Sequence, residues 1–282
     1  MSAGQVQRIN FIGTGKVGET LMRRIKLSRG CTVGEVASGH VESAVRAVVS
    51  TGVGIAVAAL DRMESAEIWI LAVPDRDIYA VALALAQSPR LPSWGCPVVC
   101  HCSGFHSLDV LSPLKSRGWR TASFHPVMSF SDPEAAAARF PGTLCGIEGD
   151  APDEISLLVE SLGGKGFSIE PDRKALYHAA AVFSSNFTVV LQAIALAAWK
   201  EAGVSEEVAT QLSAALLTGT AANVVRDGPQ VALTGPAARN EEEVIRQEEA
   251  VLAQWRPGSA ALYHDLTTLA RTLKLTGRVY KT

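Results

Sequence analysis

Three glycines near the start of the chain have the spacing of a phosphate-binding turn. Gly13, Gly15 and Gly18 end the predicted strand Arg8–Gly13 and open a segment with helical periodicity. In such a G-x-G-x-x-G turn the first glycine permits the bend, the second lets the backbone approach a pyrophosphate, and the third lets the helix pack closely. The predicted dinucleotide-binding residues of this turn are Gly13, Thr14, Gly15, Lys16, Val17 and Gly18. A purely structural glycine turn is the alternative.

The end of the predicted second strand, Thr32–Ala37, bears on the choice of dinucleotide. NAD sites usually carry an acidic residue here, which holds the ribose hydroxyls. This strand ends instead in Ser38, Gly39 and His40. Without an acid there is no repulsion against a 2′-phosphate, and Ser38 and His40 can donate hydrogen bonds to one. The sequence therefore predicts NADP (NADPH) rather than NAD, and an ordinary turn that does not discriminate is the alternative.

Later strands of the predicted sheet also end in residues that would face the cofactor crevice, because ligands bind at the carboxyl ends of parallel strands. Val73 and Pro74 are expected to line the cofactor site. Ser103 and His125 end the next two strands and are predicted catalytic residues. Ser103 can present a hydroxyl to the substrate, and His125 can bind a carboxylate or take part in proton transfer. For His125, a plain strand end before Pro126 is the alternative.

A second group of candidate residues lies on a helix predicted to begin after Pro171. Lys174 and His178 are four residues apart and so share one helix face. Ser185 returns to nearly the same direction, whereas Asn186 lies further round. Reduction of a carbonyl or imine needs a proton donor, a role that Lys or His suits near neutral pH. We expect Lys174 as the donor and His178 as its substitute; a solvated lysine and a buried, hydrogen-bonded histidine are the alternative.

The elements that must position these residues follow from apolar patterning. Strands are predicted at 8–13, 32–37, 67–73, 97–102, 121–125, 143–147 and 166–169, with helices between them. Apolar strands separated by helices are typical of a parallel sheet covered on both faces. Helices alone are predicted afterwards, at 173–202, 205–226, 240–253 and 260–274. The sequence thus predicts an α/β fold: a Rossmann domain with a mostly parallel, doubly wound sheet over 1–170, followed by an all-helical domain over 171–282.

Composition narrows the class of protein. The chain has 282 residues, of which 48% are hydrophobic, enough for a substantial core. Its 26 basic and 28 acidic residues give a net charge of −2, which disfavours nucleic acid as a partner. The first residues lack an apolar signal segment, and five cysteines form an odd set, so reduced thiols and a cytoplasmic location are expected.

Two further features each have a simple interpretation. The stretch 179–199 carries no charge and is long enough to cross a membrane, but Ser184, Ser185, Asn186 and Gln192 interrupt it. We expect a buried central helix and no membrane, and the apolar surface of the helical domain predicts a homodimer. Cys96, Cys100 and Cys102 with His101 could suggest a metal site, but in a strand Cys100 and Cys102 point to one face and His101 to the other. Buried thiols and no metal are therefore expected.

The chain resembles a known superfamily in several motifs: Phe11–Gly18, Ala72-Val73-Pro74-Asp75, Ser103-Gly104, His125-Pro126 and a helix that begins with a lysine. This superfamily contains 6-phosphogluconate and β-hydroxyacid dehydrogenases, pyrroline-5-carboxylate reductase, ketopantoate reductase and prephenate dehydrogenase. The chain looks most like a branch that joins a Rossmann-like domain to a helical domain of unknown function. That likeness rests on Lys174–Ala180, Ser185-Asn186 and Leu233–Arg239.

The resemblance implies an NAD(P)-dependent oxidoreductase that is dimeric through its helical domain. It would transfer a hydride between the nicotinamide and a small, carboxylate-bearing carbonyl/hydroxy or imine/amine substrate in an interdomain cleft. Ser185, Asn186 and Arg239 are the predicted substrate-binding residues, with Arg239 as a candidate carboxylate clamp. For Arg239, a surface residue at the start of a helix is the alternative. β-Hydroxyacid dehydrogenases have a glycine-rich turn before the lysine and asparagine four residues after it; His178 stands there in this chain. A non-catalytic NAD(P)-binding sensor or regulatory protein is the alternative.

Overall fold

The computed structural model describes residues 6–90 and 97–280. The chain divides into two compact units, Met1–Ser185 and Asn186–Thr282. The division lies later than the predicted boundary at residue 170. The reason is the helix Lys174–Ser184 (α7), whose first residues bond to strands of the first unit and therefore belong to it.

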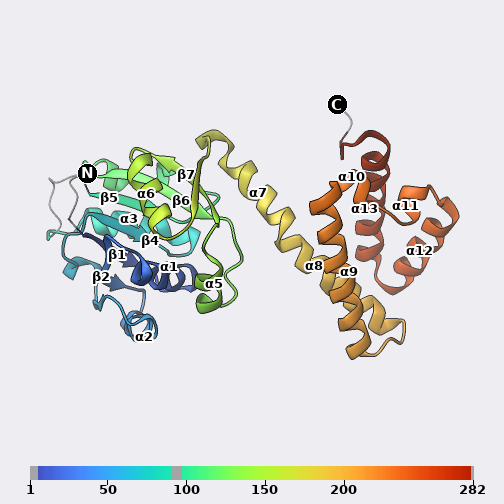
Figure 1. Ribbon diagram of the computed structural model, residues 1–282, viewed down its shortest axis with the longest axis horizontal. Coiled ribbons are helices and arrows are strands. Elements are labelled where there is room, and N and C mark those ends of the chain that lie inside the picture. Colours follow the sequence, from blue (N-terminus) through green and yellow to red (C-terminus); the bar gives the residue numbers. More distant parts are fainter. Residues whose placement is uncertain (1–5, 91–96, 281–282) are drawn as a thin grey trace. The chain divides into compact units, whose positions relative to one another are not determined.

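The first unit contains one eight-stranded sheet (Figure 1). Its strands are β1 (Gln7–Ile12), β2 (Cys31–Ala37), β3 (Ile55–Ala56), β4 (Ile68–Leu71), β5 (Val98–His101), β6 (Arg120–Pro126), β7 (Leu144–Gly149) and β8 (Lys165–Ser168). They lie in the order β3-β2-β1-β4-β5-β6-β7-β8, and every neighbouring pair is parallel except the antiparallel pair β6–β7. The predicted Rossmann-type α/β fold is confirmed; the short strand β3 was not predicted.

Helices cover both faces of this sheet. The helices of the first unit are α1 (Lys16–Leu27), α2 (Val41–Thr51), α3 (Ile78–Ala86), α4 (Ser112–Lys115), α5 (Pro133–Arg139), α6 (Pro152–Ser161) and α7, with 3-10 turns at Leu60–Arg62, Asp75–Asp77, Leu108–Leu111 and Pro171–Arg173. Strand β4 shows why: Ile68 and Ile70 pack into a core with α1 and α6, whereas Trp69 and Leu71 pack into a second core with α3 and α4. Alternate residues of one strand thus enter two apolar layers, as expected for a strand buried on both sides.

The strand order changes direction beside β1. The chain runs outward from β1 through β2 to β3, then returns to place β4 on the other side of β1. In an open α/β sheet, the crevice outside the carboxyl ends of the strands at this point binds ligands. The residues that follow β1 and β4 are therefore the first place to look for a site.

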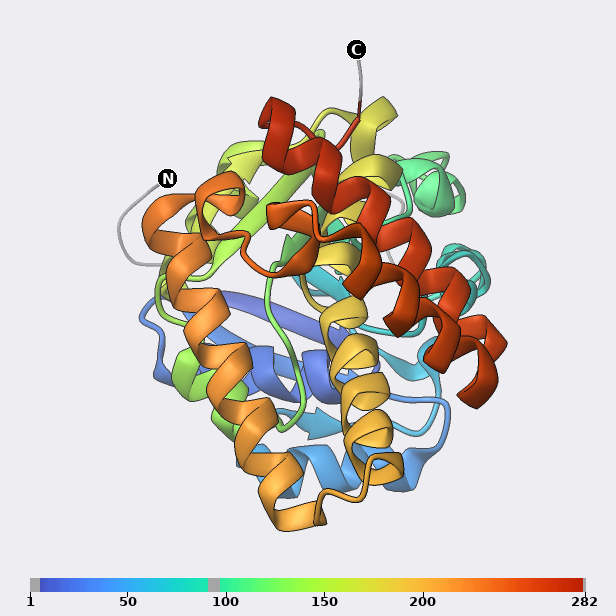
Figure 2. The ribbon, with the colours of Figure 1, turned by 90° about the vertical axis from the view of Figure 1, so that its right-hand side faces the viewer.

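The second unit is helical throughout its described residues. Its helices are α8 (Asn186–Glu201), α9 (Glu206–Asp227), α10 (Pro229–Ala232), α11 (Pro236–Arg239), α12 (Glu242–Trp255) and α13 (Pro257–Thr276). Ser205 begins α9 as its N-cap, since its hydroxyl accepts a hydrogen bond from the backbone N–H of Val208. Helices α8 and α9 run side by side, as do α12 and α13 (Figure 2).

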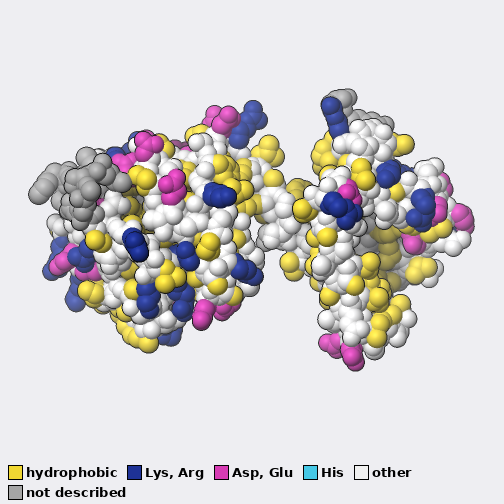
Figure 3. All heavy atoms as spheres, in the orientation of Figure 1, with side chains coloured by type: hydrophobic (Ala, Val, Ile, Leu, Met, Phe, Trp, Pro, Cys, Tyr) yellow, Lys and Arg dark blue, Asp and Glu magenta, His cyan; other side chains and the backbone are white. Residues whose placement is uncertain are grey.

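The apolar stretch 179–199 is not the buried central helix that we expected. Helix α8 contains no fully buried residue, and apolar side chains are visible over α8 and α9 in Figure 3. The apolar sequence pattern did not tell a helix buried within this chain from one with an exposed apolar surface. By length and composition alone, Pro171–Glu201 and Glu206–Asp227 could also cross a membrane.

Candidate active site

The glycine-rich turn connects β1 to α1 at the point where the strand order changes direction. Gly13 has φ +102°, and a Cβ built on it would lie 2.3 Å from the carbonyl oxygen of Ala72. A Cβ on Gly18 would lie 2.3 Å from the carbonyl oxygen of Gly13, so only glycine allows α1 to approach the turn this closely. Around Gly15, no atom lies within 4 Å of such a Cβ. The backbone is therefore open at the second glycine, where the motif requires a pyrophosphate to approach.

A cavity of about 580 Å³ lies beside this turn. Its volume is within the range of small-molecule and cofactor sites. Six of the predicted cofactor-binding residues line it: Gly13, Thr14, Gly15, Ser38, Val73 and Pro74. The other four lie outside its lining: Lys16, Val17, Gly18 and His40. Lys16 and His40 are exposed, whereas Val17 packs against the core that contains α1.

Sequence reasoning missed the opposite wall of this cavity. That wall consists of Ala59 and Leu60 after β3, and of Asp77, Ala80, Val81 and Ala84 at α3. Strand β3 has only two residues, too few to show a period, so the segment after it gave no signal. The small side chains of α3 were a usable signal, since alanine on a helix facing a strand end leaves room for a ligand.

The end of β2 faces the cavity with hydroxyl and backbone groups. Thr14 donates a hydrogen bond to the hydroxyl of Ser38 over 3.1 Å, which connects the glycine turn to β2. The acidic residue of β2, Glu35, lies within the strand and accepts from the backbone N–H of Glu64 at 2.6 Å. It also pairs with Arg8 at 3.7 Å. This carboxylate therefore has a structural role and does not stand where an NAD site needs its acid.

Ser103 connects the loops after β4 and β5. Its hydroxyl donates to Asp75 over 2.9 Å and accepts from the backbone N–H groups of Phe105 and His106 at 3.1 and 3.0 Å. A hydroxyl has one hydrogen to donate, and here Asp75 takes it. Ser103 was predicted to be catalytic. In the structure its side chain is buried, its hydroxyl hydrogen is already donated, and its hydrogen bonds shape the turn that contains Gly104.

Two imidazoles converge on that turn. A Cβ built on Gly104 would lie 2.6 Å from Nδ1 of His178 and 2.9 Å from Nε2 of His125. The two ring centroids are 5.8 Å apart. On its other side, Nδ1 of His125 lies 2.8 Å from the hydroxyl oxygen of Tyr177. The structure therefore brings together His125 at the end of β6 and His178 on α7, two residues predicted from sequence, and adds Tyr177, which was not.

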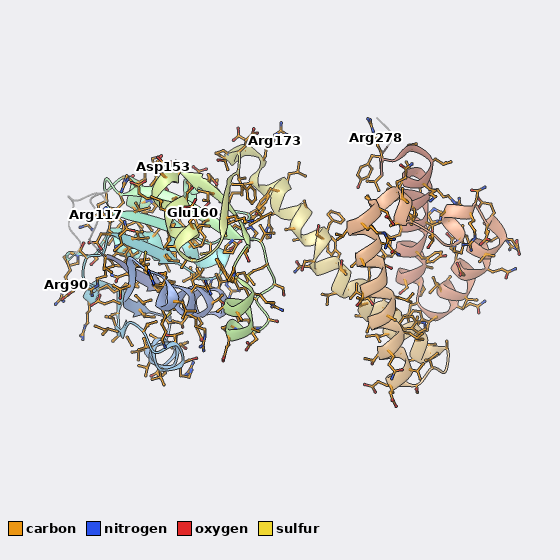
Figure 4. The ribbon with its side chains drawn as sticks, viewed as in Figure 1. Arg90, Arg117, Asp153, Glu160, Arg173 and Arg278 are labelled. Atoms are coloured by element: carbon orange, nitrogen blue, oxygen red, sulfur yellow. The ribbon has the colours of Figure 1, made fainter. Side chains whose placement is uncertain are left out.

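Lys174, one helical turn before His178, is buried and is not among the exposed groups of the site. Its side chain is only 1% exposed, and Nζ lies 2.9 Å from a carboxylate oxygen of Glu148. Nζ also donates to the hydroxyl of Ser123 over 2.6 Å. The preceding residue, Arg173, points outward (Figure 4). The role of Lys174 as the group that donates a proton to the substrate stays a prediction, and the structure shows the ammonium group buried with two partners already.

Burial sets the protonation states of this region. It lowers the pKa of His125 to about 4 and that of His101, which ends β5, to about 3. Burial also raises the pKa of Tyr177 to about 12. The pKa of Lys174 is lowered by burial, and its contact with Glu148 opposes this shift. At neutral pH both buried imidazoles are therefore uncharged, and the phenol keeps its hydrogen.

The three predicted substrate-binding residues are exposed. Ser185 is the C-cap of α7, whereas Asn186 begins α8 and Arg239 ends α11 in the second unit. The guanidinium of Arg239 binds both carboxylate oxygens of Glu241, at 2.8 and 2.9 Å. A carboxylate-bearing ligand would have to displace Glu241. The roles of these residues stay predictions.

The cysteine-rich strand has a structural explanation. Cys100 is buried in β5, and its thiol lies 3.5 Å from the carbonyl oxygen of Trp69. Cys96 lies outside the described residues. The four described cysteines are free, and no group of three or more His, Cys, Asp or Glu within 6–90 and 97–280 could hold a metal ion.

Two family models match separate stretches of the chain. The family model described as NADP oxidoreductase coenzyme F420-dependent matches residues 8–91. The family model described as Domain of unknown function (DUF2520) matches residues 143–270. The NADP oxidoreductase match thus lies in the first unit, and the DUF2520 match begins at β7 of the first unit and continues through most of the helical unit. This two-domain composition confirms the resemblance drawn from the motifs. No match to a curated protein is found.

Solved structures share the fold of this chain. A Thermotoga maritima protein is 28% identical, with a TM-score of 0.73 over 95% of this chain and 99% of its own. A Bacteroides fragilis protein, provisionally named an NADP oxidoreductase, is 22% identical, with a TM-score of 0.76 over 94% and 98%. Pyrroline carboxylate reductase from Plasmodium falciparum, solved with NADP bound, is 11% identical, with a TM-score of 0.60 over 95% and 100%. A prephenate dehydrogenase and further pyrroline-5-carboxylate reductases are also similar.

Proposed function

We propose that the protein is an NADP-dependent oxidoreductase that transfers a hydride between the nicotinamide and a small carbonyl/hydroxy or imine/amine substrate. The observation that carries this proposal is the glycine turn beside the 580 Å³ cavity at the point where the strand order changes direction. The turn fits a dinucleotide because its backbone is open at Gly15 and the first turn of α1 follows directly. Bound NADPH would supply the hydride to the carbonyl or imine carbon.

The chain's own residues would then handle the charge and the proton. When a hydride reaches the carbonyl or imine carbon, the electron pair of the double bond moves to the heteroatom, which takes up one proton. We assign the proton donor to His178, which is half-buried and whose Nδ1 faces Gly104. His125 would offer a hydrogen bond to the same heteroatom. Lys174 would anchor the start of α7, which carries His178, because its buried ammonium group contacts Glu148 on β7 and Ser123 on β6.

The finer parts of the proposal rest on separate arguments. A carboxylate on the substrate follows from the resemblance to β-hydroxyacid and prephenate dehydrogenases. A cytoplasmic location follows from the free cysteines, which suit a reducing compartment. The preference for NADP follows from Ser38 and Gly39, which stand in the cavity lining at the end of β2 without an acid beside them in the chain.

We expect NADPH to bind more tightly than NADH. A 2′-phosphate placed at the end of β2 would find the hydroxyl of Ser38 and no carboxylate at that strand end. Titrating both reduced cofactors against the protein by fluorescence measures the two dissociation constants. Equal or tighter binding of NADH would contradict the prediction.

A matched pair of variants tests the site itself. Gly15→Val should abolish binding of both cofactors without loss of folding, since no atom lies within 4 Å of the new Cβ. Gly219→Val on α9 has equally open surroundings and should leave binding unchanged. NADPH oxidation with a panel of small oxo acids and imines then separates an enzyme from a sensor. Tight binding without turnover across the panel would favour the sensor.

We also propose that the protein is a homodimer through its helical unit. Val189 and Val190 on α8 and Leu216 and Val225 on α9 are exposed apolar side chains of one helix pair. A second copy of this pair offers the same apolar surface, as a two-fold interface requires. This proposal accounts for two apolar helices without a membrane.

Sedimentation at micromolar concentration should give the mass of a dimer. The variant Val189→Glu should shift the protein toward monomer, because a carboxylate would enter the interface uncompensated. The control Val49→Glu changes an exposed valine on α2 in the first unit and should leave the dimer intact. A wild-type protein that sediments as a monomer would refute the proposal.

A further inference from the structure

The contact between Tyr177 and His125 is built into the antiparallel pair β6–β7. His125 on β6 stands opposite Gly146 on β7. A Cβ on Gly146 would lie 3.1 Å from the hydroxyl oxygen of Tyr177 and 2.1 Å from Cδ1 of Ile169. The missing side chain on β7 therefore makes the space in which the phenol reaches Nδ1 of its neighbour at 2.8 Å.

The number of hydrogens decides which group donates. A neutral imidazole carries one N–H, and a phenol has one O–H. If Nδ1 of His125 donated to Tyr177, the phenol hydrogen would need another acceptor, and Nε2 would face Gly104 as a bare acceptor. If Tyr177 donates, its hydrogen is satisfied and only one N–H, on Nε2, is left for a ligand. Leaving a half-buried donor unsatisfied costs about 1–3 kcal/mol, so the second arrangement is favoured.

The N–H on Nε2 of His125 then lies near Nδ1 of His178, a second nitrogen that has no hydrogen-bond partner among the described residues. Nε2 of His125 and Nδ1 of His178 both lie against Gly104, within 2.9 Å of the position that its Cβ would occupy. Nδ1 of His178 has no hydrogen-bond partner within residues 6–90 and 97–280. Two polar groups without a protein partner thus converge on one spot, as expected where a polar atom of a substrate binds.

We propose that Tyr177 is a positioning residue: its hydroxyl donates to Nδ1 of His125, fixes the hydrogen of that imidazole on Nε2 and directs this N–H at the heteroatom of the substrate. The inference rests on the proposed oxidoreductase function for the substrate, but the tautomer is a property of the free protein. A neutral imidazole N–H placed where negative charge develops stabilises that charge without giving up its hydrogen.

The experiment reads the tautomer directly. Protein labelled with ¹⁵N-histidine is compared by NMR as wild type, Tyr177→Phe and Tyr280→Phe, the last being a control at an exposed tyrosine of the second unit. In the wild type and the control, we expect His125 to carry its hydrogen on Nε2 throughout pH 6–8. In Tyr177→Phe, which keeps the ring and loses only the hydroxyl, we expect a mixture of both tautomers.

Two outcomes would overturn the inference: a wild-type His125 with its hydrogen on Nδ1, or an unchanged tautomer in Tyr177→Phe. With a substrate in hand, Tyr177→Phe should lower kcat by about tenfold or more, with KM for NADPH within twofold of the wild type. An unchanged kcat would refute the positioning role even where the tautomer changes. Absence of turnover in the wild type would count against the proposed function alone, because the tautomer result does not depend on it.

Discussion

A Lys174→Met variant is expected to lose about 3–5 kcal/mol of folding stability, the usual cost of removing one partner from a buried ion pair. Lys174 and Glu148 have side chains only 1% and 4% exposed, so the carboxylate would stay buried without a counter-charge. Ser123 would also lose its bond to Nζ. Chemical denaturation measures the loss, and Lys165→Met, at an exposed lysine of β8, is the control.

The double variant Glu148→Leu, Lys174→Met separates structure from chemistry. Replacing a buried ion pair by apolar residues is often neutral, so most of the lost stability should return. We expect this variant to bind NADPH as the wild type does and to turn over faster than the single variant. A double variant that stays as unstable as Lys174→Met would contradict the ion-pair assignment. A stable double variant that binds NADPH but has no turnover would restore Lys174 as the catalytic lysine of the sequence prediction.

The second large effect is a loss of stability in mild acid. The pKa of His101 is lowered to about 3 and that of His125 to about 4, against an ordinary value of 6.5. Between pH 6.5 and about 4 the unfolded chain therefore binds protons at these positions that the folded chain does not. The free energy of unfolding then rises with pH, by up to about 1.4 kcal/mol per pH unit for each histidine. From pH 6.5 down to pH 5, the two together should cost about 3 kcal/mol.

Denaturation curves at pH 7, 6 and 5 test this expectation. A His101→Asn variant should lose about half of the pH dependence, because one of the two titrating groups is gone. The control His40→Asn changes an exposed histidine and should keep the full slope. A flat profile between pH 6.5 and 5 in the wild type would show that the buried imidazoles do not exclude protons as the geometry implies.

The sequence predicted the fold well because its signals are local. The glycine turn, the apolar strands and the helical periods each involve a few consecutive residues, and the structure has all of these strands. The long helix predicted at 173–202 is divided at Ser185 into α7 and α8. The same locality explains two failures. Strand β3 has two residues, too few to show a period. The stretch 179–199 is apolar, and its pattern does not indicate which surface it packs against.

The site was only partly predictable because side-chain partners are not local. Lys174 and His178 share a helix face in the sequence, yet the lysine is buried against Glu148 and Ser123 while the histidine reaches Gly104. Helical spacing gives a common direction but not the depth of each side chain. Likewise, Ser103 is at a strand end as predicted, but Asp75, far away in sequence, takes its hydrogen. Tyr177 gave no signal in the sequence because its contact with His125 depends on the space left by the missing side chain of Gly146, on another strand.

The antiparallel ladder between β6 and β7 has a consequence for how this chain can change in length. Ser123 stands opposite Glu148, and His125 stands opposite Gly146, two residues further along the same pair of strands. Inserting or deleting one residue in either strand would move every later side chain to the other face of the sheet. The contacts of Lys174 with Ser123 and Glu148 would then be lost together with the contact between His125 and Tyr177. Changes of length in this region should therefore be tolerated outside the ladder, for example between Ser129 and Asp132, where the chain has left the sheet before α5 begins.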